Sequence, residues 1–236
     1  MKARTVVAAT LVSICAVIGI AFSAAAGEAG GGKAVKVLCF GDSITYGYSA
    51  SDQKTTSYPA ILQKLLNERH GAGAFEVVNS GVSGETTAQG LSRIDKVLAE
   101  EKPAWVLVLY GTNDLWTSRK LAPADTEKNI KAILEKVKAA GTKAIAGTIL
   151  PVWDEAARVA KRNESITKAA KDEGAVVADL NAAFEEALKG AGGNTDKAAW
   201  LKYYALEDES FLHPNDEGNA LLAAKWFEAL EAASAK

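Results

Sequence analysis

Cysteine and histidine are scarce in this sequence of 236 residues, which contains two of each. Cys15 falls in an apolar N-terminal run, so Cys39 has no second cysteine to pair with in the rest of the chain. The apolar neighbours of Cys39, residues 37–40, indicate a buried structural thiol and not a nucleophile. With two histidines, one buried cysteine and no clustered carboxylates, we expect no bound metal and no cofactor.

The sequence also lacks an excess of positive charge. Lysine and arginine number 27 against 29 acidic residues, which gives a formal net charge of −2 at pH 7. Proteins that bind nucleic acids usually carry a basic patch or stripe. We therefore expect no nucleic-acid partner, and no sequence feature indicates an obligate protein partner.

The first 26 residues have the pattern of a secretory signal peptide. Lys2 and Arg4 form a short basic start, residues 6–22 are almost wholly apolar, and three alanines at 24–26 supply small residues for a signal peptidase. An uncleaved membrane anchor is disfavoured, because the run is shorter than the roughly 20 apolar residues of a spanning helix. We expect export to the periplasm or the medium after cleavage near Ala26.

The rest of the chain is expected to form one domain. Residues 27–34 are rich in glycine and predict a flexible lead-in, and residues 35–236 suit a single α/β domain with a sizeable core. The signal segment holds two basic residues and no acidic one, so its removal changes the net charge from −2 to −4.

Short apolar runs alternate with amphipathic segments along this domain. Expected strands are 35–40, 75–78, 105–110, 144–148 and 175–178; expected helices are 57–69, 87–99, one from 125 or 126 to 141, one ending near 170, 181–188 and 216–233. Residues 190–212 are expected to be irregular. Continuous apolar strands between amphipathic helices predict a parallel sheet covered by helices on both faces.

Small and amide residues follow the first three expected strands. Ser43 comes after the first strand, Gly84 after the second and Asn113 after the third. The carboxyl ends of parallel strands share one edge of a sheet, where binding sites gather. Of the two histidines, His70 ends a helix, where it caps carbonyl groups or faces solvent. His213, stiffened by Pro214, is the better candidate for a base.

These residues suit nucleophilic catalysis on an acyl group. A serine hydroxyl becomes a competent nucleophile when a base takes its proton, and His213 would serve Ser43 in this way. The oxyanion that forms needs preorganised donors. Candidates are the backbone N–H groups of Ser43 and Gly84 and the side-chain amide of Asn113, and Gly84 allows close approach because it has no side chain.

The same residues resemble the hallmarks of the GDSL, or SGNH, hydrolase family. Residues 40–45 (FGDSIT) resemble its first block, 111–114 (GTND) its third and 213–215 (HPN) its fifth, and the likeness covers about 35–233. It implies a flavodoxin-like three-layer α/β/α sandwich with strand order 2-1-3-4-5. Residues 83–93 look like the bacterial thioesterase I/lysophospholipase/arylesterase branch. The G-x-S-x-G elbow of α/β-hydrolases is missing.

The sequence departs from the family pattern three residues before the histidine, where Ser210 replaces the usual aspartate. Three arrangements are open. Asp208 or Glu209 reaches the imidazole from a slightly longer loop, a backbone carbonyl orients it, or the triad is degraded. The third triad member fixes the tautomer of the base and stabilises the imidazolium, so a Ser–His dyad would still work, more slowly.

Four further residues beside these turns have open roles. Asp42 and Asp114 are expected to hold turns by hydrogen bonds and not to act in catalysis. Trp116 and Trp153 follow the third and fourth strands. They either wall a pocket for an acyl or aromatic group or cover the edge of the core.

Three functions compete at this stage. The first is a carboxylesterase, lysophospholipase or thioesterase acting through an acyl-enzyme on Ser43, with a small-molecule or lipid ester as substrate. The second keeps the chemistry and is a carbohydrate O-acetylesterase or acetyl transferase, which suits an exported protein. The third is a non-catalytic binding module that has kept the fold, motivated by Ser210.

Overall fold

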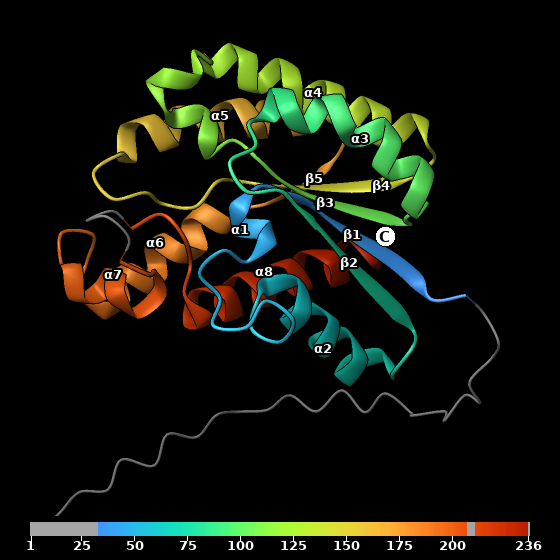
Figure 1. Ribbon diagram of the computed structural model, residues 1–236, viewed down its shortest axis with the longest axis horizontal. Coiled ribbons are helices and arrows are strands. Elements are labelled where there is room, and N and C mark those ends of the chain that lie inside the picture. Colours follow the sequence, from blue (N-terminus) through green and yellow to red (C-terminus); the bar gives the residue numbers. More distant parts are fainter. Residues whose placement is uncertain (1–32, 207–210, 236) are drawn as a thin grey trace, which may run out of the picture. The chain divides into compact units, whose positions relative to one another are not determined.

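A five-stranded parallel sheet forms the centre of the computed structural model, which describes residues 33–206 and 211–235. Its order is β2-β1-β3-β4-β5 (Figure 1), as predicted from the family resemblance. The strands are β1 (Val35–Gly41), β2 (Phe75–Gly81), β3 (Trp105–Leu109), β4 (Lys143–Gly147) and β5 (Val176–Ala178). All neighbouring strands pair in parallel.

Helices cover both faces of this sheet, which confirms the three-layer sandwich (Figure 1). One layer holds α3 (Thr87–Glu101), α4 (Pro123–Ala139) and α5 (Ala156–Glu173); the other holds α2 (Tyr58–His70), α6 (Leu180–Ala191), α7 (Lys197–Tyr203) and α8 (Asp216–Ser234). Short turns of helix, α1 (Ser43–Tyr46), η1 (Asn113–Leu115) and η2 (Thr117–Arg119), follow β1 and β3. None of the helices in the described ranges is long and apolar enough to span a bilayer.

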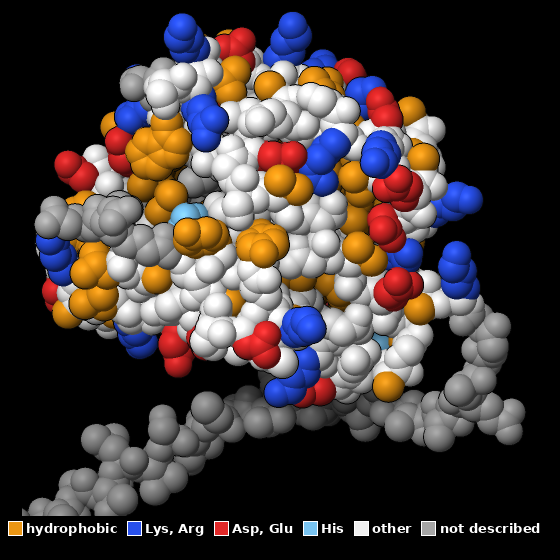
Figure 2. Space-filling model, in the orientation of Figure 1, with side chains coloured by type: hydrophobic (Ala, Val, Ile, Leu, Met, Phe, Trp, Pro, Cys, Tyr) orange, Lys and Arg blue, Asp and Glu red, His pale blue; other side chains and the backbone are white. Residues whose placement is uncertain are grey.

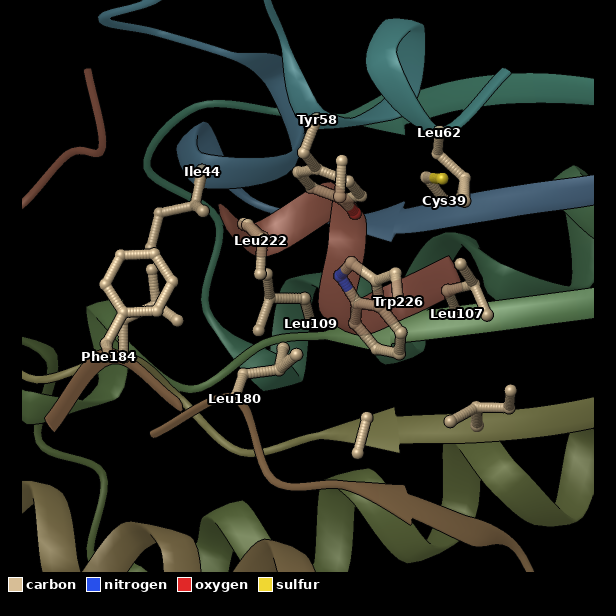
Figure 3. Packing of buried hydrophobic residues seen from close by; sticks show 14 of the residues in the cluster. Cys39, Ile44, Tyr58, Leu62, Leu107, Leu109, Leu180, Phe184, Leu222 and Trp226 are labelled. Atoms are coloured by element: carbon tan, nitrogen blue, oxygen red, sulfur yellow. The ribbon is translucent and has the colours of Figure 1, made fainter. Parts of the chain in front are cut away.

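Alternate residues of β1 belong to the two halves of the core. Val37 and Cys39 pack with the layer of α2 and α8, whereas Leu38 and Phe40 pack with the layer of α3 and α4. This double burial explains why β1 is an unbroken apolar run. Figure 3 shows Cys39 among Leu62, Tyr58 and Trp226. Burial raises the pKa of the Cys39 thiol to about 12, so it stays protonated, as a structural thiol does.

The prediction that residues 190–212 are irregular was wrong in part, because α7 lies within them. The Asp196 side chain accepts a hydrogen bond from the backbone N–H of Ala198 and so caps the helix. Trp200 is buried, and its indole N–H donates to the carbonyl of Asn194. The helix is held by this tertiary contact, and its seven residues are too few to show a periodic pattern.

His70 is exposed at the end of α2, as one of the two predicted alternatives had it, and its ring also contacts two neighbouring elements. Its Nε2 lies 2.6 Å from Oε1 of Glu231 on α8, and its ring packs against Phe75 at 5.0 Å between centroids. Phe75 begins β2, at the edge of the sheet opposite the carboxyl ends of the strands. His70 therefore joins two helices at the far edge and leaves His213 as the one histidine near Ser43.

Candidate active site

Ser43 is the first residue of α1, directly beyond the carboxyl end of β1. The N-cap of this one-turn helix is Asp42, whose carboxylate accepts a hydrogen bond from the backbone N–H of Ile44 at 3.0 Å. Gly47 ends the helix in the left-handed conformation, with φ of +84°. Ser43 is therefore fixed on a tight turn at the rim of the sheet.

The structure brings His213 to Ser43 across 170 positions of sequence. The distance from His213 Nε2 to Ser43 Oγ is 2.8 Å, which is a hydrogen bond. The backbone of His213 is held in place because its carbonyl accepts from the N–H of Ala205 at 3.0 Å. On its other side, Asn215 caps α8 by accepting from the N–H of Gly218. The base is thus anchored before the helix begins.

Gly84 and Asn113 lie on the same rim, as the sequence predicted. Gly84 has a φ of +80°, a backbone conformation that a residue with a side chain rarely adopts. The Asn113 Nδ2 atom lies 3.0 Å from the carbonyl oxygen of Glu85 and 3.4 Å from Oδ2 of Asp42. The first bond fixes the amide against the residue next to Gly84, so both candidate oxyanion donors are held by one turn.

The candidates for the third triad position, Asp208 and Glu209, lie outside the described residues together with Ser210. The orienting partner of His213 therefore stays a prediction from the sequence.

The family model for GDSL-like lipases and acylhydrolases matches residues 39–221, which include all the rim residues described above. The chain belongs to this family. The match explains why a GDSL-like first turn, a histidine before the last helix and a parallel sheet occur together.

Several relatives of this GDSL-family chain are named as esterases. It is 37% identical to esterase TesA of Pseudomonas aeruginosa over 109 residues, 46% of this chain and 51% of the relative. It is 36% identical to a thioesterase/protease/lysophospholipase of Escherichia coli, over 45% of this chain and 47% of the relative. These matches span about half of each curated relative. An acetylxylan esterase of Geobacillus stearothermophilus is 28% identical over 81% of this chain and 92% of the relative.

Solved structures resemble the GDSL-family fold over most of its length. A structure of TesA has a TM-score of 0.66 at 26% identity and covers 84% of this chain and 98% of its own. An acetyl xylan esterase of Geobacillus stearothermophilus has a TM-score of 0.69 at 24% identity, and the match covers 84% of this chain and 95% of that structure. At this identity the likeness shows only that the two proteins share a fold.

Behind the rim, Arg93 of α3 joins the ends of three strands in this GDSL-family protein. Its Nε lies 2.7 Å from Glu85 Oε2, and its Nη2 donates to Ser80 O at 2.7 Å and to Gly41 O at 3.2 Å. The hydroxyl of Tyr110 also donates to Glu85 Oε2 at 2.6 Å. This group of side chains supports the turn that carries Gly84. Sequence reasoning gave Arg93 and Glu85 no role, although both lie in a family-like segment.

Asp114 holds the third turn, as predicted. It accepts hydrogen bonds from the backbone N–H and the hydroxyl of Thr87, at 3.0 and 2.6 Å, and from the hydroxyl of Thr126 at 2.7 Å. Arg162 of α5 donates to the backbone carbonyl of Asp114 at 2.6 Å. These bonds fix the backbone beside Asn113 to α3, α4 and α5, so the buried Asp114 holds the turn that carries Asn113.

Trp153 covers the edge of the core. Its ring contacts Trp200 and Phe211, both with centroids 5.4 Å away, and these two residues are buried. Trp116 packs against the other half of the core. Both tryptophans are partly buried, so of the two predicted roles the structure supports the packing role.

Asp42 makes the stability of the folded protein depend on pH. Complete burial raises the pKa of its carboxyl to about 7, opposed by the hydrogen bond from Ile44 and aided by the charge of Asp114. Its pKa in the unfolded chain is about 3.9. The folded state therefore binds the proton more tightly, and this stabilisation, complete below about pH 4, is lost as the pH rises toward 7.

The expected result is a difference in pH profile between the wild type and Asp42→Asn. From pH 5 to pH 8, the wild type loses about 2 kcal/mol of unfolding free energy relative to the variant, which has no carboxyl to ionise at this position. Urea unfolding of both proteins at the two pH values measures this difference. Parallel profiles would show that Asp42 is not protonated in the folded state near pH 5.

Proposed function

We propose that this protein is an exported serine ester hydrolase, with Ser43 as nucleophile and His213 as general base. The observation that carries the proposal is the 2.8 Å contact between Ser43 Oγ and His213 Nε2, within the range of a nucleophile activated by an adjacent base. Family membership supports the same reaction class, because the matched model describes lipases and acylhydrolases.

In the proposed reaction, Ser43 Oγ attacks the ester carbonyl carbon while its proton passes to His213 Nε2. The carbonyl oxygen becomes an oxyanion, stabilised by the N–H groups of Ser43 and Gly84 and by the Asn113 amide. The carbon–oxygen bond to the alcohol then breaks, and His213 returns the proton to the leaving oxygen. Water, deprotonated by His213, hydrolyses the acyl-Ser43 ester by the same two steps and releases the acid.

Replacing Asn113 by alanine is expected to lower kcat by about 10²–10³-fold, because an oxyanion donor acts mainly in the transition state. KM should change little. Steady-state kinetics on a p-nitrophenyl ester measure both values. A matched control is Asn181→Ala, whose amide donates to the carbonyl of Ile149 beyond β4. A large rise in KM with unchanged kcat would contradict the assignment, since it would place Asn113 in ground-state binding.

The relatives suggest two classes of ester as substrate. Those matched over about half their length carry the names esterase, thioesterase/lysophospholipase and arylesterase, and favour a lipid-like or aryl ester. The acetylxylan esterase is matched over 92% of its length, which favours an O-acetylated carbohydrate as the second candidate. A groove of about 550 Å³ beside α1 and α2 has none of the proposed catalytic residues in its lining, so it does not favour either class.

The test of this proposal is hydrolysis of p-nitrophenyl esters from acetyl to palmitoyl, together with acetylated xylo-oligosaccharides. A preference for medium or long chains supports the lipid-like class, and activity confined to acetyl groups supports the carbohydrate class. Labelling by a fluorophosphonate, mapped to Ser43 by mass spectrometry, reports the nucleophile without the natural substrate. A folded protein that hydrolyses none of these esters and leaves Ser43 unlabelled would be the non-catalytic module.

Export is part of the proposal and rests on the sequence of residues 1–26. A named relative in Bacillus subtilis is an uncharacterized lipoprotein, which agrees with a function in the cell envelope. We expect the full chain, expressed in a bacterium, to appear outside the cytoplasm with its N-terminus at Gly27. Intact-mass measurement of the fractionated protein tests this, and recovery of uncleaved chain in the cytoplasm would contradict it.

A further inference from the structure

We propose that Tyr48 is a positioning residue for His213, whose ring holds the imidazole against Ser43 and stabilises its protonated form. The inference rests on the proposed function, because it concerns the base of the same site. Neither the family match nor the resemblance in the sequence gave Tyr48 a role.

The aromatic ring of Tyr48 lies over the imidazole of His213. The centroids of the two rings are 4.8 Å apart and their planes are inclined by 38°. Tyr48 is 58% exposed, so the side chain is not retained for burial in the core. On the face of the molecule seen in Figure 2, hydrophobic side chains reach the surface beside a histidine. One face of this exposed tyrosine ring packs on the imidazole and shields the candidate base from solvent.

The backbone holds Tyr48 in this place from both sides. Its N–H donates to the carbonyl of Ser43 at 3.1 Å, so the covering ring and the nucleophile are tied by one hydrogen bond. Three residues further on, Ser51 donates from its N–H and its hydroxyl to Asp216, at 2.8 and 2.5 Å. Asp216 begins α8, which starts just after His213. The loop of Tyr48 is therefore fastened to the two segments that carry Ser43 and His213.

This contact acts on the protonation of His213. The face of an aromatic ring carries partial negative charge and attracts a cation within about 6 Å, and an imidazolium forms at His213 when it accepts the Ser43 proton. The ring therefore stabilises the imidazolium that forms in the transition state. It also limits rotation of the imidazole away from Ser43 Oγ, which a flexible loop would allow.

Other charged and titratable groups near His213 are the same with and without the ring. Among the described residues they are Asp42 before Ser43, Asp216 on α8, and Lys202 and Tyr203 at the end of α7. In the sequence, Glu207, Asp208 and Glu209 also precede His213, and these lie outside the described residues. A comparison between variants at position 48 holds these groups constant. The difference in pKa then reports the ring alone.

The decisive experiment is an NMR titration of the His213 Cε1–H signal in the wild type, Tyr48→Leu and Tyr48→Phe. The full chain is expressed and the purified protein used as it is recovered. Two histidines are present, so His70→Gln assigns the signals. Leucine keeps an apolar cover but has no aromatic face, so we expect its His213 titration curve to lie at lower pH than that of the wild type. The curve of Tyr48→Phe should match the wild type.

Kinetics provide the second readout. Tyr48→Leu is expected to lower kcat about three- to fivefold with KM unchanged, and to shift the acid limb of kcat/KM in the same direction as the NMR titration. The matched control is Phe75→Leu, which removes the aromatic ring that contacts the other histidine, His70, at 5.0 Å between centroids, and it should leave kcat and KM unchanged.

Three results would overturn the proposal. The first is a His213 titration in Tyr48→Leu that matches the wild type. The second is an equal loss of kcat in Tyr48→Phe, which would assign the effect to the hydroxyl, and the third is a change in KM alone, which would make Tyr48 a substrate contact. The titration needs no activity. If Ser43 is not labelled and no ester is cleaved, the proposed function fails, while the pKa comparison still decides whether the ring acts on the imidazole.

Discussion

Replacing Ser43 by alanine should lower kcat for ester hydrolysis by about 10⁴-fold or more, while the protein stays folded. The hydroxyl is the atom that forms the acyl-enzyme, so its removal leaves only the donors of the oxyanion site and ordinary binding to act on the ester. Ser43 is 7% exposed, and its Oγ is the partner of His213 at 2.8 Å. The small volume removed is compatible with unchanged folding. Burst and steady-state kinetics on a p-nitrophenyl ester measure the loss.

Two controls make this result specific. Ser83→Ala removes an exposed hydroxyl next to Gly84 on the same rim and should leave kcat within about twofold. The kcat of His213→Ala should be lowered nearly as much as that of Ser43→Ala. The double variant should have no lower kcat than the single variants, because the effects of residues that act as one unit are not additive. If Ser43→Ala kept a tenth of the activity or more, another group would be the nucleophile.

The sequence predicted β1 and β3 well because these central strands are buried on both faces. The apolar runs of β1 and β3 need no knowledge of their neighbours to be recognised. The strand order came from the family resemblance and not from the residues alone. The end of β2 was placed three residues early, because residues 79–81 are polar or glycine and form a strand only by pairing with β1. Helix α7 was missed for a similar reason, since its stability comes from buried Trp200.

The residues of the candidate site could be proposed from the sequence because few residue types in the chain can act as a base. Two histidines leave few choices for a base, and Ser43 follows the first strand in a turn of recognisable composition. Contacts between distant side chains were not predictable, because they depend on how segments far apart in the sequence pack together. The contact of Tyr48 with His213 and the hydrogen bonds of Arg93 belong to this class. No local pattern of residues reports them.

Arg93 is expected to contribute strongly to stability. Its guanidinium donates to Glu85, to the hydroxyl and carbonyl of Ser80, and to Gly41 and Tyr110, and it lies 4.3 Å above the ring of Phe40. The side chains of Arg93 and Glu85 are 19% and 14% exposed, so water replaces few of these bonds. Removing one member leaves the other charge nearly buried and unpaired, which typically costs about 3–5 kcal/mol.

We therefore expect Arg93→Met to lower the unfolding free energy by about 3–5 kcal/mol in urea titrations. Arg158→Ala is the matched control, because Arg158 pairs with Glu155 at 2.8 Å but is 41% exposed, and it should cost less than about 1 kcal/mol. The double variant Glu85→Gln/Arg93→Met should recover part of the loss, since neither charge is then left alone. Equal costs for Arg93→Met and Arg158→Ala would mean that the ends of β1, β2 and β3 are held by packing. In that case the turn carrying Gly84 and the carbonyl that binds Asn113 would not depend on Arg93.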